Sequence, residues 1–209
     1  MAESNNSHSL IINKLKKAML AYDEDAFNKT LKKQIEKSGL EKTFFEGIVP
    51  FLEHVGLLWL NDKACPAQEH FSSNLIRKIL FTEIDKLGTV INQKSTFVLF
   101  LPCGEDHEIN LLFLNYLLKK KGCRVLYLGS NTPQRQIEST AMLNPNSVAI
   151  TYSVILKKPE FETTINSYNH SLFKQFLVIG PRYKLALNGG KVLVINNLKE
   201  LKKIFKIFV

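Results

Sequence analysis

The sequence predicts an α + α/β protein, with an N-terminal four-helix bundle followed by a doubly wound parallel five-stranded sheet. Apolar residues recur at helical spacing through the first half, whereas short apolar strands alternate with helical segments in the second half. The pattern changes in the segment 88–95, which we expect to be a linker. We therefore predict a disordered lead-in over 1–9, a helical bundle over 10–92 and a Rossmann-like domain over 93–209.

Four helices account for the first half. They are expected over 10–22, from Asp23–Asp25 to just before Gly39, over 40–60, and from Pro66 to about residue 87. Asp23 is a good N-cap, Gly39 a good terminator and Pro66 a good first helical residue. Pro50 lies inside the third segment and predicts a kink or bend there. Short connections between amphipathic helices are typical of a bundle.

Five strands account for the second half, and each is short and rich in apolar residues. They are expected over 96–101, 124–128, 147–152, 175–179 and 191–195. Helical patterns between successive strands predict parallel pairing, because a crossover helix must return the chain to the same end of the sheet. Five strands in such a segment match the flavodoxin-like arrangement, in which ligands bind beyond the carboxyl ends of the strands.

Composition places the chain in a general class. The net charge of +9 lies in residues 93–209, which hold 16 basic and 7 acidic residues, whereas residues 1–92 hold 12 of each. A basic half suits an anionic partner, but a helix end and a solvated helix face explain most of these lysines better. No apolar run is long enough to cross a membrane, and no signal peptide is evident. Three scattered cysteines fit a reducing cytoplasm, where we expect the protein to reside.

The most informative motif is Gly104-Glu105-Asp106-His107-Glu108-Ile109-Asn110, between a predicted strand and a predicted helix. A histidine at that turn lies where such sheets bind ligands. Its imidazole can coordinate a metal if the other ring nitrogen has a partner, such as Glu105 or a backbone carbonyl. A surface histidine at a helix start is the alternative. His8 and His170 lie in polar stretches and are expected to face solvent.

The segment 104–133 resembles the cobalamin-binding domain shared by corrinoid proteins and some transcriptional regulators. Glu105-Asp106-His107 precedes an apolar helix, and Val125–Gly129 and Thr132-Pro133 follow it. The resemblance implies that His107 is the lower axial ligand of cobalt, beside Glu105 or Asp106, and that the nucleotide tail of cobalamin lies beside the sheet. It also implies contacts from loops that contain Gly129, Thr132, Thr151-Tyr152-Ser153 and Gly180-Pro181-Arg182.

The first half is similar to the helical cap of light-sensing MerR-type regulators that bind adenosylcobalamin. Trp59 is followed, after nine residues, by Glu69-His70. In that resemblance the cap covers the upper face of the corrin, and Trp59, Glu69 and His70 surround the adenosyl group. The two resemblances together cover about residues 10 to 195.

Three positions depart from the family pattern. Asn110 and Pro181 stand where glycines are usual, and Leu60 stands where the light sensors have a histidine that captures cobalt. A side chain at 110 is expected to crowd the corrin. Because leucine cannot ligate cobalt, we expect no bis-histidine photoproduct.

The sequence therefore predicts a cobalamin-binding sensory region of a transcriptional regulator, not an enzyme, that self-associates. Adenosylcobalamin is expected between cap and Rossmann-like domain. Because nothing before Leu10 resembles a helix-turn-helix, DNA would be bound only through a domain absent from this chain. Two alternatives stay open: a corrinoid carrier subunit of a methyltransferase, and an interaction module that kept the fold without the cofactor.

Overall fold

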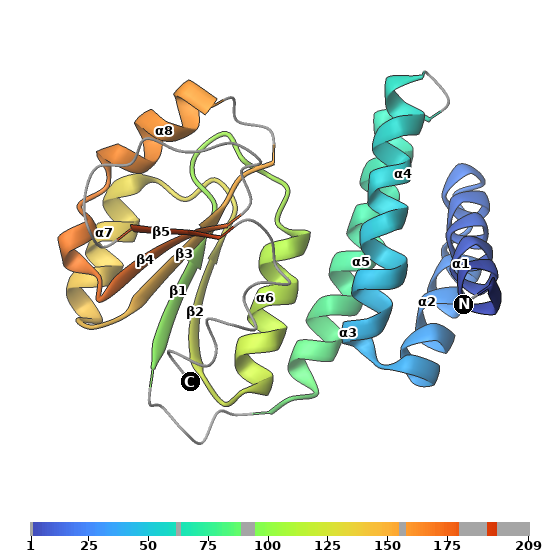
Figure 1. Ribbon diagram of the computed structural model, residues 1–209, viewed down its shortest axis with the longest axis horizontal. Helices are drawn as coiled ribbons and strands as arrows, with labels where there is room; N and C mark the ends of the chain where they lie inside the picture. Colours follow the sequence, from blue (N-terminus) through green and yellow to red (C-terminus); the bar gives the residue numbers. More distant parts are fainter. Residues whose placement is uncertain (1, 62–63, 89–94, 155–157, 180–191, 196–209) are drawn as a thin grey trace. The chain divides into compact units, whose positions relative to one another are not determined.

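The computed structural model of this protein describes residues 2–61, 64–88, 95–154, 158–179 and 192–195. The chain divides into two compact units, Met1–Glu83 and Ile84–Val209. The first contains helices, and the second contains the sheet with its covering helices (Figure 1). The predicted linker lies mostly outside the described residues, so the domain boundary at 92–93 stays a prediction. No helix in the described part of the chain is long and apolar enough to cross a membrane.

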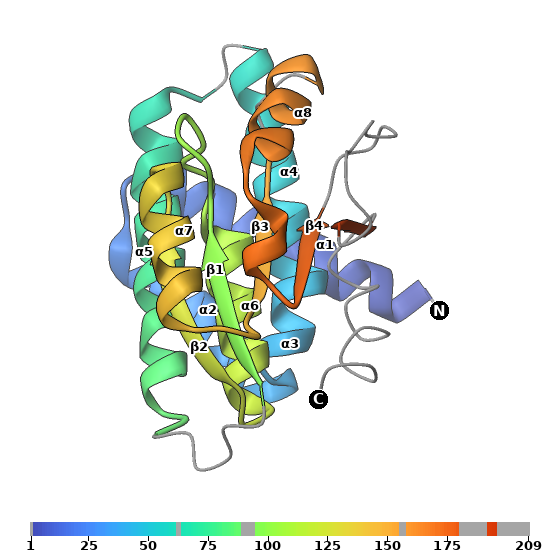
Figure 2. The same cartoon turned by 90° about the vertical axis from the view of Figure 1, so that its left-hand side faces the viewer.

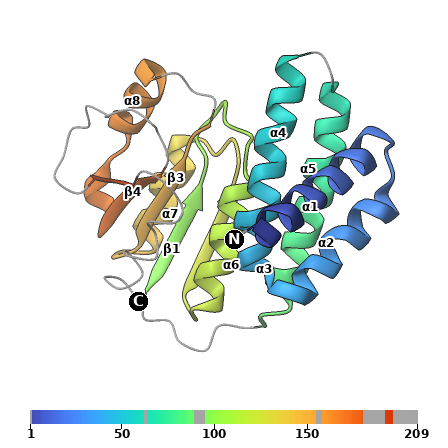
Figure 3. The ribbon, with the colours of Figure 1, turned by 45° about the vertical axis from the view of Figure 1, so that its right-hand side comes forward.

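The N-terminal unit consists of α1 (Ala2–Leu20), α2 (Glu24–Ser38), the continuous run formed by α3 (Leu40–Thr43), η1 (Phe44–Ile48) and α4 (Val49–Leu60), and α5 (Pro66–Asp85). α1 packs against α2 and α4 (Figure 3). The core of this N-terminal unit includes Phe27 and Phe51, which are fully buried with ring centroids 5.6 Å apart. The Asp23 side chain caps α2 by accepting a hydrogen bond from the Ala26 N–H at 2.9 Å.

The third predicted helix contains a π-helical stretch. The Val49 N–H donates to the Phe44 carbonyl, five residues earlier, at the end of η1. Pro50 follows in the first turn of α4, immediately after this irregularity. A proline removes one N–H donor, and the wider π turn beside it is a recognised way to accommodate such a gap.

The second unit holds a five-stranded, all-parallel sheet in the order β2-β1-β3-β4-β5. The strands are β1 (Thr96–Phe100), β2 (Arg124–Gly129), β3 (Val148–Tyr152), β4 (Gln175–Ile179) and β5 (Val192–Ile195). α6 (Ile109–Lys120) lies on one face, and α7 (Gln134–Leu143) and α8 (Lys158–Ser167) lie on the other (Figures 1 and 2). The short helix η2 (His170–Leu172) precedes β4. The predicted fold class is confirmed.

Packing explains the two-sided burial of the sheet. Beneath α7 and α8, the buried cluster includes Phe100 from β1, Phe161 from α8 and Phe176 from β4. The sequence reads as continuous apolar strands because both faces are covered.

Element boundaries agree with the predictions to within about two residues, with one exception. α1 begins at Ala2, so the predicted start at Leu10 was too late. The residues before Leu10 are mostly polar and show no amphipathic pattern, so hydrophobic periodicity did not predict this N-terminal extension of the helix. The sequence also predicts a last helix with Lys199, Lys202, Lys203 and Lys206 on its solvated face, and that segment lies outside the described residues.

Candidate functional site

The site lies at the point in the sheet where the order of successive strands reverses. β1 lies between β2 and β3, so the chain leaves β1 toward α6 on one face and leaves β3 toward α8 on the other. The loops after β1 and β3 therefore diverge at this point, which is where open α/β sheets bind ligands. The loop after β1, residues 101–108, carries the motif identified from sequence.

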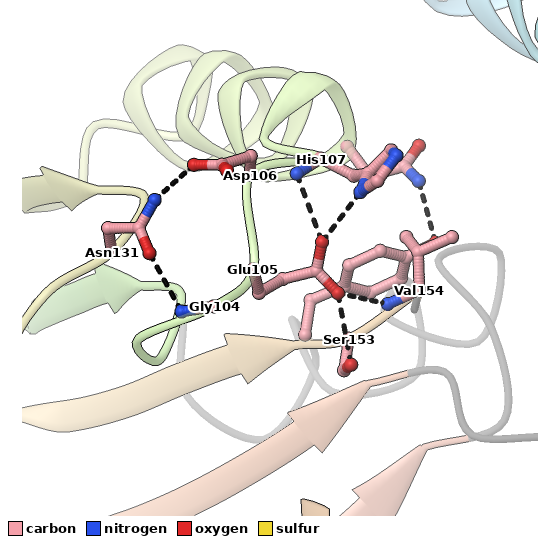
Figure 4. Close-up of polar contacts among 9 residues, drawn as sticks. Gly104, Glu105, Asp106, His107, Asn131, Ser153 and Val154 are labelled. Atoms are coloured by element: carbon pink, nitrogen blue, oxygen red, sulfur yellow. Dashed lines mark hydrogen bonds and ion pairs between the residues drawn. The ribbon is translucent and has the colours of Figure 1, made fainter. Parts of the chain in front are cut away.

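His107 is held by Glu105 from the same loop (Figure 4). The His107 Nδ1 lies 2.8 Å from the Glu105 Oε1, and the His107 backbone N–H donates to the same oxygen at 3.0 Å. The imidazole is about half exposed, at 50%, whereas the Glu105 side chain is fully buried. The structure thus selects Glu105 over Asp106 as the carboxylate beside the histidine.

The second oxygen of Glu105 is held by the loop after β3. The Ser153 hydroxyl donates to Oε2 at 3.0 Å, and the Val154 backbone N–H donates to it at 2.6 Å. Both carboxylate oxygens thus accept two hydrogen bonds, which suits the ionised form. Since an ionised carboxylate can only accept, Nδ1 is the donor in this contact, and a neutral His107 ring therefore carries its lone pair on Nε2.

Asp106 points away from this pair, toward the loop after β2 (Figure 4). Its Oδ1 accepts a hydrogen bond from the Asn131 side-chain amide, and the Asn131 Oδ1 accepts from the Gly104 N–H at 2.7 Å. Sequence reasoning missed Asn131. A faint signal was available: asparagine is one of the few residues that tolerate a positive φ, and Asn131 adopts φ 51°.

Asn110 lies in the first turn of α6, and its side chain reaches the end of β3. Its Nδ2 donates to the Tyr152 hydroxyl at 2.8 Å, a partner that the sequence did not suggest. The side chain at 110, expected to crowd a ligand, is therefore engaged with a side chain of the sheet. Nearby, the Tyr127 hydroxyl donates to the buried Glu108 at 2.6 Å.

Gly129 is the last residue of β2, and Thr132 lies in the loop that follows. Gly129 adopts φ 82°, which favours glycine, and its carbonyl accepts from the buried Thr132 hydroxyl at 3.3 Å. The Thr151 hydroxyl oxygen, at the end of β3, is fully buried and has no hydrogen-bond partner among the residues that the structure describes. A hydroxyl in this position can exchange a hydrogen bond with an additional polar group.

The cap residues lie at one end of the helical unit, on either side of the short α4–α5 connection. Trp59 is in the last turn of α4 and is 56% exposed. Glu69, in the first turn of α5, accepts a hydrogen bond from Ser73, and its Oε2 lies 3.2 Å from the His70 Nδ1. An exposed indole and an oriented carboxylate thus lie near the two ends of the same connection.

Two further expectations have different outcomes. Gly180, Pro181 and Arg182 lie outside the described residues, so the predicted loop there stays a prediction. His170 was expected to face solvent, which is wrong. Its ring packs edge-on against Phe176 with centroids 4.8 Å apart, and its Nε2 lies 2.9 Å from the Ile165 carbonyl oxygen. Polar neighbours in the sequence gave no sign of this burial.

Comparison with known proteins identifies a family model and two regulators that this chain resembles. Residues 11–82 match the family model described as "B12 binding domain". The chain is 30% identical over 119 residues to the HTH-type transcriptional repressor CarA of Myxococcus xanthus, a match that covers 56% of this chain and 39% of CarA. It is 26% identical over 156 residues to the HTH-type transcriptional repressor CarH of the same organism, covering 74% of this chain and 52% of CarH.

A solved structure shares the fold. The monomethylamine corrinoid protein of Methanosarcina barkeri aligns with a TM-score of 0.73 at 12% identity, over 96% of this chain and 99% of that chain. The predicted resemblance to a B12-binding family and to helix-turn-helix regulators is thereby confirmed. The matched regions span about half or less of the lengths of CarA and CarH.

Proposed function

We propose that this chain is the cobalamin-binding sensory region of a transcriptional regulator and has no catalytic activity of its own. The observation that carries the proposal is the His107–Glu105 pair at the β1–β3 switch point. It presents a half-exposed imidazole whose Nδ1 lies 2.8 Å from a fully buried carboxylate. An imidazole oriented through one nitrogen is prepared to coordinate a metal through the other.

The residues present fit a corrinoid. His107 would coordinate cobalt through Nε2 from below, and Glu105 would fix the ring and favour the tautomer with the lone pair on Nε2. The unpartnered Thr151 hydroxyl would meet a polar atom of the nucleotide tail at the end of β3. The remaining contacts to the cofactor would come from the residues around this pair, namely Asp106, Asn110, Gly129, Thr132, Ser153 and Gly180.

Trp59, Glu69 and His70 would line the upper side, with adenosylcobalamin as the favoured form. An exposed indole offers a flat apolar surface to the adenine, and a carboxylate held by Ser73 can accept hydrogen bonds from ribose hydroxyls. When bound, the cofactor would supply a cobalt–carbon bond that light or chemistry can break. Occupancy would change the position of the cap and hence self-association, with DNA bound through a helix-turn-helix outside these residues.

The test is a visible absorption titration of the purified chain with adenosylcobalamin in the dark, comparing wild type with His107→Ala. The wild type is expected to show the spectrum of cobalamin with its own base displaced and histidine bound. His107→Ala is expected to lose the histidine-bound spectrum and to regain part of it when free imidazole is added.

Electron paramagnetic resonance identifies the ligand atom directly. In the cobalt(II) form, protein labelled with ¹⁵N-histidine is expected to change the nitrogen splitting from three lines to two, because the axial nitrogen comes from the protein. Unchanged splitting would assign the axial nitrogen to the cofactor and contradict the role of His107. No binding by the wild type would favour the cofactor-free interaction module.

The variant Asn110→Gly tests whether the natural chain still binds the cofactor or has lost it. If the wild type binds no cobalamin and Asn110→Gly does, the natural chain has lost its ligand through that side chain. Because Asn110 is bonded to Tyr152, we expect the wild type to bind already and Asn110→Gly to change the affinity by less than about tenfold.

A further inference from the structure

The loop that carries His107 is anchored on two sides, by two different loops of the sheet. On one side Glu105 accepts hydrogen bonds from Ser153 and Val154, after β3. On the other side Gly104 and Asp106 bond to Asn131, after β2 (Figure 4). Glu105, in the first anchor, contacts the imidazole directly, whereas the second anchor holds the Gly104 backbone and the Asp106 side chain, which precede the histidine.

Asn131 makes both of its contacts through one amide group. Its oxygen accepts from the Gly104 N–H at 2.7 Å, and its nitrogen donates to the Asp106 carboxylate. A side-chain amide supplies an acceptor oxygen and a donor nitrogen on one planar group. An aspartate at 131 would still accept from Gly104 but would repel Asp106. Of residues 106 and 131, one must therefore be the donor and the other the acceptor.

The platform that carries Asn131 is itself fixed by backbone bonds on both sides. The Leu101 N–H donates to the Gly129 carbonyl at 2.8 Å, and the Thr132 N–H donates to the Leu101 carbonyl at 3.0 Å. Asn131 lies between these two bonds with φ 51°, in the left-handed region that asparagine tolerates. The amide therefore meets the histidine loop from a position with little freedom to move.

We propose that Asn131 is a positioning residue for His107. It fixes the Gly104 backbone and the Asp106 side chain, and thereby the course of the loop that sets the direction of the imidazole. This role rests on the proposed cobalt ligation by His107. Asn131 touches neither the imidazole nor the ligand in this proposal, and it acts through the loop alone.

The experiment exchanges the two side chains. Asn131→Asp places two carboxylates together, whereas the double variant Asp106→Asn with Asn131→Asp restores one donor and one acceptor in reversed order. Asn144→Asp is the matched control, because it makes the same change of charge in a loop that bonds to Arg124 instead. Two signals are read: adenosylcobalamin affinity with its histidine-bound spectrum, and the Nδ1–H resonance of His107 in ligand-free protein.

Asn131→Asp is expected to weaken adenosylcobalamin binding about tenfold, to lower the histidine-bound fraction and to shift or broaden the His107 resonance. The exchanged double variant is expected to recover the His107 resonance of the ligand-free protein, and the control to change none of the three signals. An unchanged His107 resonance in Asn131→Asp would overturn the proposal, as would failure of the double variant to recover while its melting temperature stays at the wild-type value. If the wild type binds no cobalamin, the proposed function fails, and the ligand-free resonance still decides the role of Asn131.

Discussion

Glu105→Gln tests the central feature of the site, because a glutamine has the shape of glutamate but only one accepting oxygen. In wild type each carboxylate oxygen accepts from one backbone N–H, that of His107 on one side and that of Val154 on the other. If the glutamine oxygen faces Val154, the His107 N–H loses its partner, and if the amide is turned over, the Val154 N–H does. Either orientation leaves one donor unpaired beside a fully buried side chain.

An unpaired buried donor costs about 1–3 kcal/mol in free energy of unfolding. For a chain of this size, about 2 kcal/mol corresponds to a melting temperature roughly 4–8 °C lower. Circular dichroism melting measures this shift, and amide hydrogen exchange at His107 and Val154 shows which donor was released. In the orientation with the amide toward His107, the ring must accept at Nδ1, so its lone pair leaves Nε2 and histidine-bound cobalamin is lost as well.

Glu108→Gln is the matched control for this prediction. Glu108 is a buried carboxylate of the same loop, and it accepts from the Tyr127 hydroxyl, which a glutamine oxygen can also satisfy. We expect a smaller loss of stability and an unchanged histidine-bound spectrum. Equal shifts for the two variants, or a melting temperature of Glu105→Gln within about 1 °C of wild type, would refute the reasoning.

Three further predictions concern other parts of the chain. Burial raises the pKa of the Cys123 thiol, and burial together with nearby negative charge raises the pKa of Tyr168. The folded state holds both protons more tightly, so their contribution is fully present below about pH 8.5 and is lost as pH rises further. Urea unfolding from pH 8 to 11 should therefore show falling stability, with a shallower fall in Tyr168→Phe. The Tyr22 hydroxyl, 3.6 Å from the Cys65 sulfur, lowers the pKa of that thiol, so Tyr22→Phe should slow iodoacetamide labelling at Cys65 near pH 7.5, measured by peptide mass spectrometry. Asn110→Ala removes the hydrogen bond to the phenol that ends β3 and should lower the free energy of unfolding by about 1 kcal/mol in urea, and an unchanged value would show that this bond contributes nothing.

Hydrophobic periodicity was sufficient to predict the order and type of the helices and strands. Each helix or strand is defined by residues close together in sequence, and the change from helical to strand period marked the change of architecture. The histidine loop was also found locally, since Glu105 and His107 are two residues apart. What local pattern could not decide was which acidic residue, Glu105 or Asp106, faces the histidine.

That choice depends on residues distant in sequence. Ser153, which bonds to Glu105, lies 48 residues further along the chain, and Asn131, which bonds to Asp106, lies 25 residues further. Only the strand order β2-β1-β3 brings the loops that carry them to either side of the histidine loop. Similarly, the burial of His170 follows from its contact with Phe176, which no helical or strand period reports.

The sequence left open the alternative that His107 is a surface histidine at a helix start. That alternative has to account for the free-energy cost of burying the Glu105 carboxylate beside it. Taking a carboxylate out of water costs several kcal/mol unless its oxygens are fully hydrogen-bonded. Glu105 is fully buried, and the hydrogen bonds that offset this cost come from His107 itself and from the loop after β3. A solvent-facing histidine that binds no ligand needs no such partner, because water can form the hydrogen bonds of its ring. A buried charge that orients a half-exposed imidazole is therefore better explained by a ligand for that imidazole than by stability alone.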